Sequence, residues 1–130
     1  MNKTLLVTGT VFGVLGIILG AFASHGLKAL ISVEALKSFE TGVRYQMYHA
    51  FLLLLIGSIT PLKEKSKRSI YFLVVIGVLF FSGSIYTLST NELTAFDFKS
   101  IALVTPLGGI LLILAWILLL INFLKIKGDN

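Results

Sequence analysis

Cysteine is absent from this 130-residue chain, and proline occurs only twice. Without cysteine there are no disulfide bonds, no thiolate metal sites and no dithiol redox chemistry. Charged residues are also scarce: they make up 13% of the chain, against about 25% in a typical soluble protein. Hydrophobic residues make up 56%. This composition indicates an integral membrane protein.

Four apolar runs occupy most of the chain, namely 5–23, 45–60, 70–89 and 101–123. Each is long enough, or nearly so, to cross a hydrocarbon layer roughly 30 Å thick at about 1.5 Å of rise per residue. The polar stretches between them are too short for a separate soluble domain. We therefore expect one integral membrane domain over 1–130, an all-α four-transmembrane-helix bundle. Its helices are predicted at about 4–24, 33–60, 69–90 and 100–124.

Basic residues are divided unequally between the two sides of such a bundle. Seven lie at the chain ends or between the second and third runs, namely Lys3, Lys63, Lys65, Lys67, Arg68, Lys125 and Lys127. The other two connections hold Lys28, Lys37, Arg44 and Lys99. The positive-inside rule then places both termini in the cytoplasm. The net charge of +5 is interpreted as a topology signal that contacts anionic lipid headgroups, not as a nucleic-acid site.

The first run has an alternative interpretation as a secretory signal, because Lys3 precedes it and Ala21-Phe22-Ala23 resembles a cleavage site. Its length and its ordered glycines favour a retained helix. These glycines recur at i, i+4, i+7 and i+11 and form one stripe, namely Gly9, Gly13, Gly16 and Gly20. Small residues at this spacing let a second helix approach closely. We expect this stripe to pack at the bundle centre, with further helix-packing glycines at Gly83, Gly108 and Gly109.

The connection 24–44 is expected to have its own structure on the outer side of the membrane. Ser32 is a favourable N-cap, and Glu34 suits the first turn of a helix. No helix breaker except Gly42 lies between 33 and 59, so one long helix is predicted to continue into the second span. Its first part forms an amphipathic segment at the outer headgroup layer. By contrast, Pro61–Ser69 is predicted to be a short turn.

Most polar residues of the runs lie toward the outer end of the predicted bundle. They are His25, Tyr45, Gln46, His49, Ser82, Ser84, Tyr86 and Thr105. Polar side chains in hydrocarbon are costly, so they usually face the bundle interior and pair with each other. We therefore predict one polar ligand pocket in the outer half of the bundle. His49 lies at its centre, and His25 and Thr105 lie at its mouth.

Each of these residues also has a purely structural interpretation. His49 has the imidazole of a metal or haem ligand, but two histidines without cysteine or an intramembrane carboxylate make a poor ligand set. We therefore expect hydrogen bonding at His49, no bound metal and no cofactor. Serines in helices bond back to the preceding turn, and tyrosines near the interface form an aromatic belt. Trp116 is expected to face lipid or fill space between helices.

Four stretches and one tryptophan resemble a known family. They are GAFASHG at 20–26, TGVRYQMYH at 41–49, FFSGSIY at 80–86, TPLGG at 105–109, and then Trp116. In this order they are similar to the bacterial membrane family catalogued as domain of unknown function 423, the YgdD/YwdK-like proteins. The family more often has glycine in place of Ala23 and alanine in place of Ser24. The resemblance covers essentially the whole chain and implies a four-span inner-membrane protein without an established reaction.

Three function classes remain open. The first is a non-enzymatic membrane protein that binds lipid, a partner membrane protein or a second copy through the polar pocket and supports envelope integrity. The absence of a catalytic constellation favours this class. The second is a small transporter or channel subunit, although proton-coupled export relies on a carboxylate inside the membrane. The third is a metal or redox protein that uses the two histidines.

Overall fold

The computed structural model of the chain describes residues 1–94 and 98–128. These residues form four α-helices: α1 (Asn2–Ser24), α2 (Val33–Ser58), α3 (Glu64–Ser89) and α4 (Val104–Leu124). Short 3-10 helices at Leu27–Ala29, Asn91–Leu93 and Phe98–Ile101 lie in the connections. Strands are absent from the described residues. The all-α prediction is therefore confirmed.

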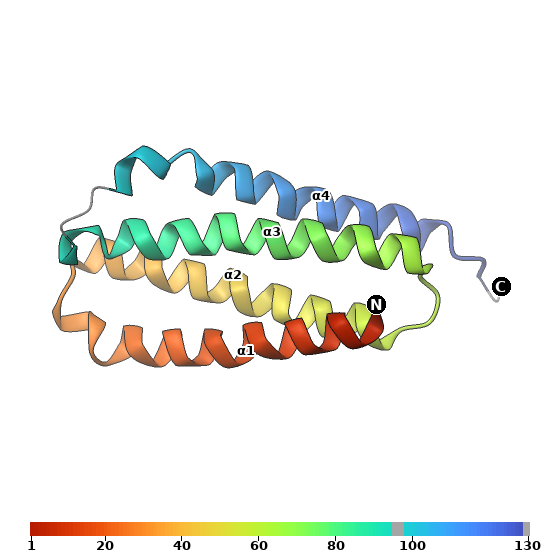
Figure 1. The fold of residues 1–130 in the computed structure, drawn as a ribbon, viewed down its shortest axis with the longest axis horizontal. Helices are drawn as coiled ribbons and strands as arrows, with labels where there is room; N and C mark the ends of the chain where they lie inside the picture. Colours follow the sequence, from red (N-terminus) through yellow and green to blue (C-terminus); the bar gives the residue numbers. More distant parts are fainter. Residues whose placement is uncertain (95–97, 129–130) are drawn as a thin grey trace.

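The four helices lie side by side in chain order, each antiparallel to the next (Figure 1). α1 packs along α2, α2 against α3, and α3 along α4, whereas contacts that skip a helix are few. α2 and α3 therefore form the centre, and α1 and α4 flank them. Both termini lie at the end where α2 turns into α3, which we call the terminal end (Figure 1). The opposite end, with residues 25–32 and 90–94, is the loop end.

Within the described residues, α1, α3 and α4 are long and apolar enough to cross a membrane. α2 has 26 residues, but the polar side chains in its first two thirds reduce its apolar character. Two of these, Gln46 and His49, are buried inside the protein. This burial follows from the central position of α2, which is covered by α1 on one side and α3 on the other.

The predicted helix boundaries hold at α2 and differ at α3. Ser32 caps α2 as predicted, because its Oγ accepts a hydrogen bond from the Ala35 N–H at 3.1 Å. The third helix, however, begins at Glu64 and not near residue 69, so the predicted turn over 61–69 is wrong. Glu64 lies in the first helical turn, where a negative charge is favoured, and it pairs with the amino group of Met1 at 3.2 Å. The fourth helix also starts later than predicted, at Val104.

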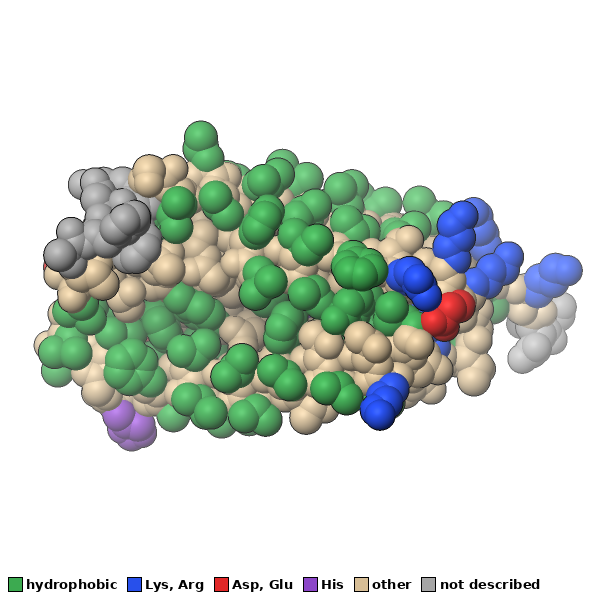
Figure 2. Space-filling view, viewed as in Figure 1, with side chains coloured by type: hydrophobic (Ala, Val, Ile, Leu, Met, Phe, Trp, Pro, Cys, Tyr) green, Lys and Arg blue, Asp and Glu red, His purple; other side chains and the backbone are tan. Residues whose placement is uncertain are grey.

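The buried apolar core lies between the helices, while the outer surface is also apolar. Leu5, Leu53, Ile56 and Val74 are completely or almost completely buried. Large apolar side chains nevertheless cover the visible face along its length, and Lys and Arg side chains gather at the terminal end (Figure 2). An apolar surface that ends in a charged cluster is what a lipid environment favours.

Glycines determine how closely α1 approaches α2. A Cβ atom on Gly9 would lie 2.9 Å from the carbonyl oxygen of Ala50, and a Cβ on Gly16 would collide with the side chain of Met47. The same close approach joins α3 to α4, where a Cβ on Gly108 would overlap the backbone nitrogen of Phe81. These glycines therefore allow backbones to pack at distances that alanine does not permit.

The remaining glycines show where the stripe prediction fails. Gly13 and Gly83 face open space with no heavy atom within 4 Å of an added Cβ, so the prediction that they mark helix contacts is wrong. Gly20 and Gly109 make only ordinary van der Waals contacts. Gly42 also makes a close approach, and two further close approaches that the sequence did not indicate lie at Gly57 and Gly77. The rotation of each helix about its axis decides these contacts, and spacing alone does not determine that rotation.

Candidate functional site

His49 connects α2 to α4 near the middle of the bundle. Its side chain is only 3% exposed, and its Nδ1 lies 2.6 Å from the carbonyl oxygen of Tyr45, one turn earlier on α2. Trp116 Nε1 donates a hydrogen bond to His49 Nε2 at 3.0 Å. Because an indole N–H is only a donor, His49 Nε2 is the acceptor and Nδ1–H donates to the carbonyl. The two neighbours thus fix a single neutral tautomer.

This arrangement adds a hydrogen bond to the role predicted for Trp116 and bears on metal binding. Trp116 is 47% exposed, so part of its ring lies at the outer surface of the bundle, and its N–H donates to His49. A metal ion on His49 Nε2 would have to displace that N–H. The described residues also contain no group of three or more His, Cys, Asp or Glu side chains that could hold a metal ion.

Next to His49 lies a hollow of about 530 Å³, lined by Tyr45, Tyr48, His49, Phe51 and Trp116. We call it the aromatic hollow. The Tyr45 ring packs against Phe81 of α3, with centroids 4.9 Å apart, and against Tyr48 at 5.6 Å. Within the described residues, the hydroxyls of Tyr45 and Tyr48 have no hydrogen-bond partner. The hollow therefore combines an apolar wall with two available phenolic groups.

Gln46 is the centre of a second polar group that connects α1, α2 and α3. Its Nε2 donates to the carbonyl oxygen of Phe12 at 2.8 Å, and the Tyr86 hydroxyl donates to its Oε1 at 2.7 Å. Ser82 donates to the carbonyl oxygen of Gly42 at 2.7 Å. Gln46, Ser82 and Tyr86 also line a hollow of about 270 Å³ between α1 and α3. Their polar atoms are bonded mainly to the protein itself, so this group acts as a helix-joining network.

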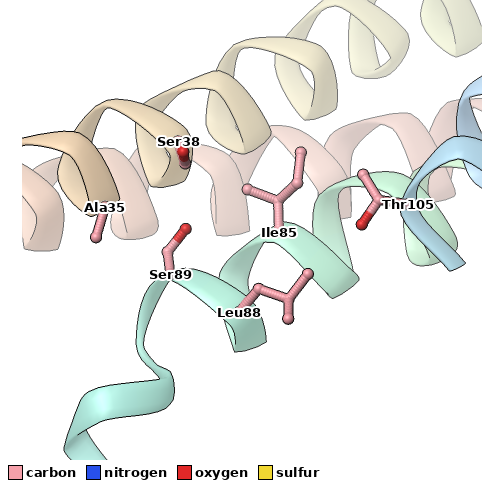
Figure 3. A pocket seen from close by; sticks show the side chains of 6 residues that line it. All are labelled: Ala35, Ser38, Ile85, Leu88, Ser89 and Thr105. Carbon is pink, nitrogen blue, oxygen red and sulfur yellow. The ribbon is translucent and has the colours of Figure 1, made fainter. Parts of the chain in front are cut away.

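A third hollow of about 250 Å³ lies at the loop end, lined by Ala35, Ser38, Ile85, Leu88, Ser89 and Thr105 (Figure 3). We call it the outer hollow. Ser38 of α2 and Ser89 of α3 face each other across it, and Thr105 of α4 lies at its other side (Figure 3). The Thr105 hydroxyl lies 2.5 Å from that of Ser84, and either can be the donor.

Comparison with known proteins identifies the family. Residues 19–109 match the family described as "Protein of unknown function (DUF423)", and this range is more than half of the chain. The chain belongs to the DUF423 family. The resemblance seen in the sequence motifs is thereby confirmed, and the matched range contains His49, Gln46 and Tyr86, which is the hydrogen-bond partner of Gln46 on α3.

The similarity of this DUF423 protein to individual relatives extends along almost its whole chain. It is 35% identical over 126 residues to the UPF0382 membrane protein SAB0533 of Staphylococcus aureus strain bovine RF122 / ET3-1, covering 97% of this chain and 99% of that protein. It is 34% identical over 129 residues to a UPF0382 membrane protein of Haemophilus influenzae, covering 98% and 99%. YwdK of Bacillus subtilis, also named a UPF0382 membrane protein, is 32% identical over 125 residues, covering 95% and 98%. No solved structure matches the chain.

The prediction of a single polar pocket in this DUF423 protein is wrong. Tyr45 and His49 line the aromatic hollow, whereas Gln46 lines the hollow between α1 and α3, and the two hollows share no residue. The reason is helix geometry, because adjacent residues on a helix point about 100° apart whereas i and i+4 share a face. His25 is an exposed residue that ends α1 and lines none of the three hollows.

Five polar or aromatic residues that line the aromatic and outer hollows were not predicted as site residues, namely Ser38, Tyr48, Phe51, Ser89 and Trp116. One signal for Tyr48 was available, since it lies three residues after Tyr45 and next to His49. A second was the indole N–H of Trp116, which usually finds a partner when its ring packs inside a protein.

The His49–Trp116 contact predicts a measurable coupling. Trp116→Phe leaves His49 Nε2 without its donor, so it should lower the free energy of unfolding in mild detergent by about 1 kcal/mol. In His49→Ala the tryptophan has already lost its acceptor. Adding Trp116→Phe to that variant should therefore lower the free energy of unfolding by less than it does in the parent chain. Additive effects of the two substitutions in a double-mutant cycle would contradict the hydrogen bond.

Proposed function

We propose that this protein spans the bacterial cytoplasmic membrane four times, with both termini in the cytoplasm. α2 runs alongside α1 and α3 over much of its length, since Gly9 of α1 packs against Ala50 of α2 and Gly42 of α2 packs against Tyr86 of α3. Its buried polar side chains are bonded within the bundle, which makes a membrane crossing by α2 compatible with its lower apolar content. The Lys and Arg side chains at the terminal end (Figure 2) support a cytoplasmic position for that end.

This topology makes a direct prediction. A reporter fused after Asn130 should report the cytoplasm, and a reporter inserted within 90–100 should report the opposite side. The expected contrast follows from seven basic residues on one side and four on the other. An exported C-terminus would contradict the proposal, and so would a mature protein that begins near Ser24.

Within the membrane, we propose that the protein is non-enzymatic and binds one lipid molecule in the aromatic hollow. The observation that carries this proposal is the combination of volume and lining at one lipid-facing position. At about 530 Å³, the hollow falls within the roughly 300–1,000 Å³ usual for small-molecule sites. Its aromatic wall suits an acyl chain, and the hydroxyls of Tyr45 and Tyr48 suit ester oxygens. Such binding is the basis on which we propose a role in envelope integrity.

The chemistry of the interior favours binding over transport or catalysis. Among the described residues, the buried polar or charged side chains include no carboxylate, the group on which proton-coupled transport across a membrane commonly depends. The buried imidazole of His49 is engaged at both nitrogens. A general base needs a free nitrogen within reach of its substrate, and His49 in this arrangement does not offer one.

Phe51 provides the test of lipid binding. In native mass spectrometry from a mild detergent, the parent chain should retain one lipid, and Phe51→Ala should lose most of it because one wall of the hollow is removed. Phe72→Ala is the matched control, since Phe51 and Phe72 are 64% and 52% exposed and only Phe51 lines the aromatic hollow. Equal lipid retention by the two variants, or no retained lipid in the parent chain, would contradict the proposal.

A further inference from the structure

The outer hollow and the aromatic hollow lie on the same faces of two helices. On α2, Ser38 lines the outer hollow and Tyr45 and His49 line the aromatic hollow. They are related as i, i+7 and i+11, so they share one face. On α4, Thr105 and Trp116 line the two hollows and are also eleven residues apart. The two hollows share no lining residue, but they follow one another along the space between these faces of α2 and α4, which we call the groove.

α3 forms the floor of this groove. Ile85 and Leu88 line the outer hollow, and the Phe81 ring lies against Tyr45 at the start of the aromatic hollow. Eleven residues from Ser38 to His49 correspond to roughly 16 Å along a helix. The groove is thus long enough for an extended chain, with apolar side chains along its floor.

The outer hollow has a different chemistry from the rest of the groove. Among the described residues, its polar side chains are three hydroxyls, from Ser38, Ser89 and Thr105, and none of its described lining residues is charged. Ser89 is only 6% exposed, yet its hydroxyl has no hydrogen-bond partner within the described residues. In the described part of the chain, no fully buried side-chain oxygen or nitrogen lacks a hydrogen-bond partner, so the Ser89 hydroxyl is accessible from the hollow, into which it points toward Ser38 (Figure 3). This arrangement suits a ligand that brings neutral oxygen atoms.

We infer that the groove between α2 and α4 binds a neutral glycerolipid of the diacylglycerol class. Its glycerol and ester oxygens lie in the outer hollow, and one acyl chain extends past Phe81 into the aromatic hollow. This inference rests on the proposed lipid binding and adds the class of headgroup. The described residues that line the outer hollow would offer a phosphate hydroxyls and apolar side chains but no cation, which disfavours an anionic phospholipid.

Trp116 is the only tryptophan of the chain and lines the groove, so its fluorescence reports occupancy. The full-length protein in mild detergent is titrated with dioleoylglycerol and, separately, with dioleoylphosphatidylglycerol. The fluorescence change should saturate at a concentration of dioleoylglycerol about tenfold lower than that of dioleoylphosphatidylglycerol. Ser89→Ala should weaken dioleoylglycerol binding about fivefold and leave binding of the phospholipid unchanged. Ser58→Ala, on the exposed face of α2 near the terminal end, should change neither.

Ser38→Ala provides a second variant that does not threaten the fold, because Ser38 is exposed at the rim of the hollow. It should also weaken the binding of dioleoylglycerol and leave the binding of the phospholipid unchanged. Equal affinities for the two lipids would overturn this inference and leave lipid binding standing. The same holds if Ser89→Ala and Ser38→Ala weaken the binding of both lipids equally. No saturable response to either lipid, together with no lipid retained by the parent chain, would overturn both proposals.

Discussion

Replacing Gly108 with alanine is expected to lower the free energy of unfolding by about 3 kcal/mol. The added Cβ would overlap the backbone nitrogen of Phe81 and lie 2.8 Å from the carbonyl carbon of Phe80. Backbone atoms in a helix cannot rotate away as a side chain can, so α4 would have to move away from α3. Thermal unfolding of the purified protein in mild detergent measures the loss.

Two glycines in open space provide the control for this experiment. Gly13→Ala and Gly83→Ala add a methyl group with no heavy atom within 4 Å, and alanine is favoured over glycine in a helix by up to about 1 kcal/mol. Both variants should therefore unfold at the same temperature as the parent chain or at a higher one. If Gly108→Ala behaves like these two, the close packing of α4 on α3 is wrong.

Replacing Lys67, at the terminal end, with alanine should lower the free energy of unfolding by a similar amount, about 3 kcal/mol. Lys67 is only 3% exposed, and its Nζ donates to Asn2 Oδ1 at 2.9 Å and to the carbonyl oxygen of Ile59 at 2.6 Å. It therefore connects the start of α1, the end of α2 and the first turns of α3. Truncation leaves both acceptors without a donor and creates a cavity. The same unfolding measurement applies.

The neighbouring Lys65 offers a matched control, because it is exposed and also belongs to the first turns of α3. Lys65→Ala should change stability by no more than about 0.5 kcal/mol. Lys67→Met keeps most of the side-chain volume and should recover part of the loss in Lys67→Ala, although it restores no donor. Equal stability of the Lys65 and Lys67 alanine variants would show that the buried ammonium does not stabilise the fold.

Lys67 also illustrates what hydropathy does and does not determine. The apolar runs predict the helices, because their length and composition follow from the thickness of a hydrocarbon layer. The same hydropathy led to a turn being predicted over 61–69, because charged residues interrupt the apolar pattern there. In the structure these residues form the first turns of α3, and Lys67 is turned inward while Lys65 stays exposed. Charge alone does not distinguish the two.

The central polar residues of the candidate site were predicted, whereas their arrangement was not. Tyr45, Gln46 and His49 were chosen because polar groups in lipid need partners, and the partners of Gln46 and His49 are now identified on α1, α3 and α4. Which of them share a hollow depends on helix rotation and on the neighbours of α2, which are tertiary properties. Trp116 was missed for the same reason, since its role depends on the 3.0 Å contact with His49 across the groove.

The central claim is that a lipid chain lies in the groove between α2 and α4, and quenching of Trp116 tests it most directly. Trp116 is the only tryptophan, and bromine atoms on an acyl chain quench its fluorescence only at short range. Titration with glycerolipid carrying 9,10-dibrominated chains should quench Trp116 saturably, with one lipid per protein. Phe51→Ala should abolish the saturable part, and Phe72→Ala should retain it. Quenching that rises without saturation, and equally in both variants, would contradict the account.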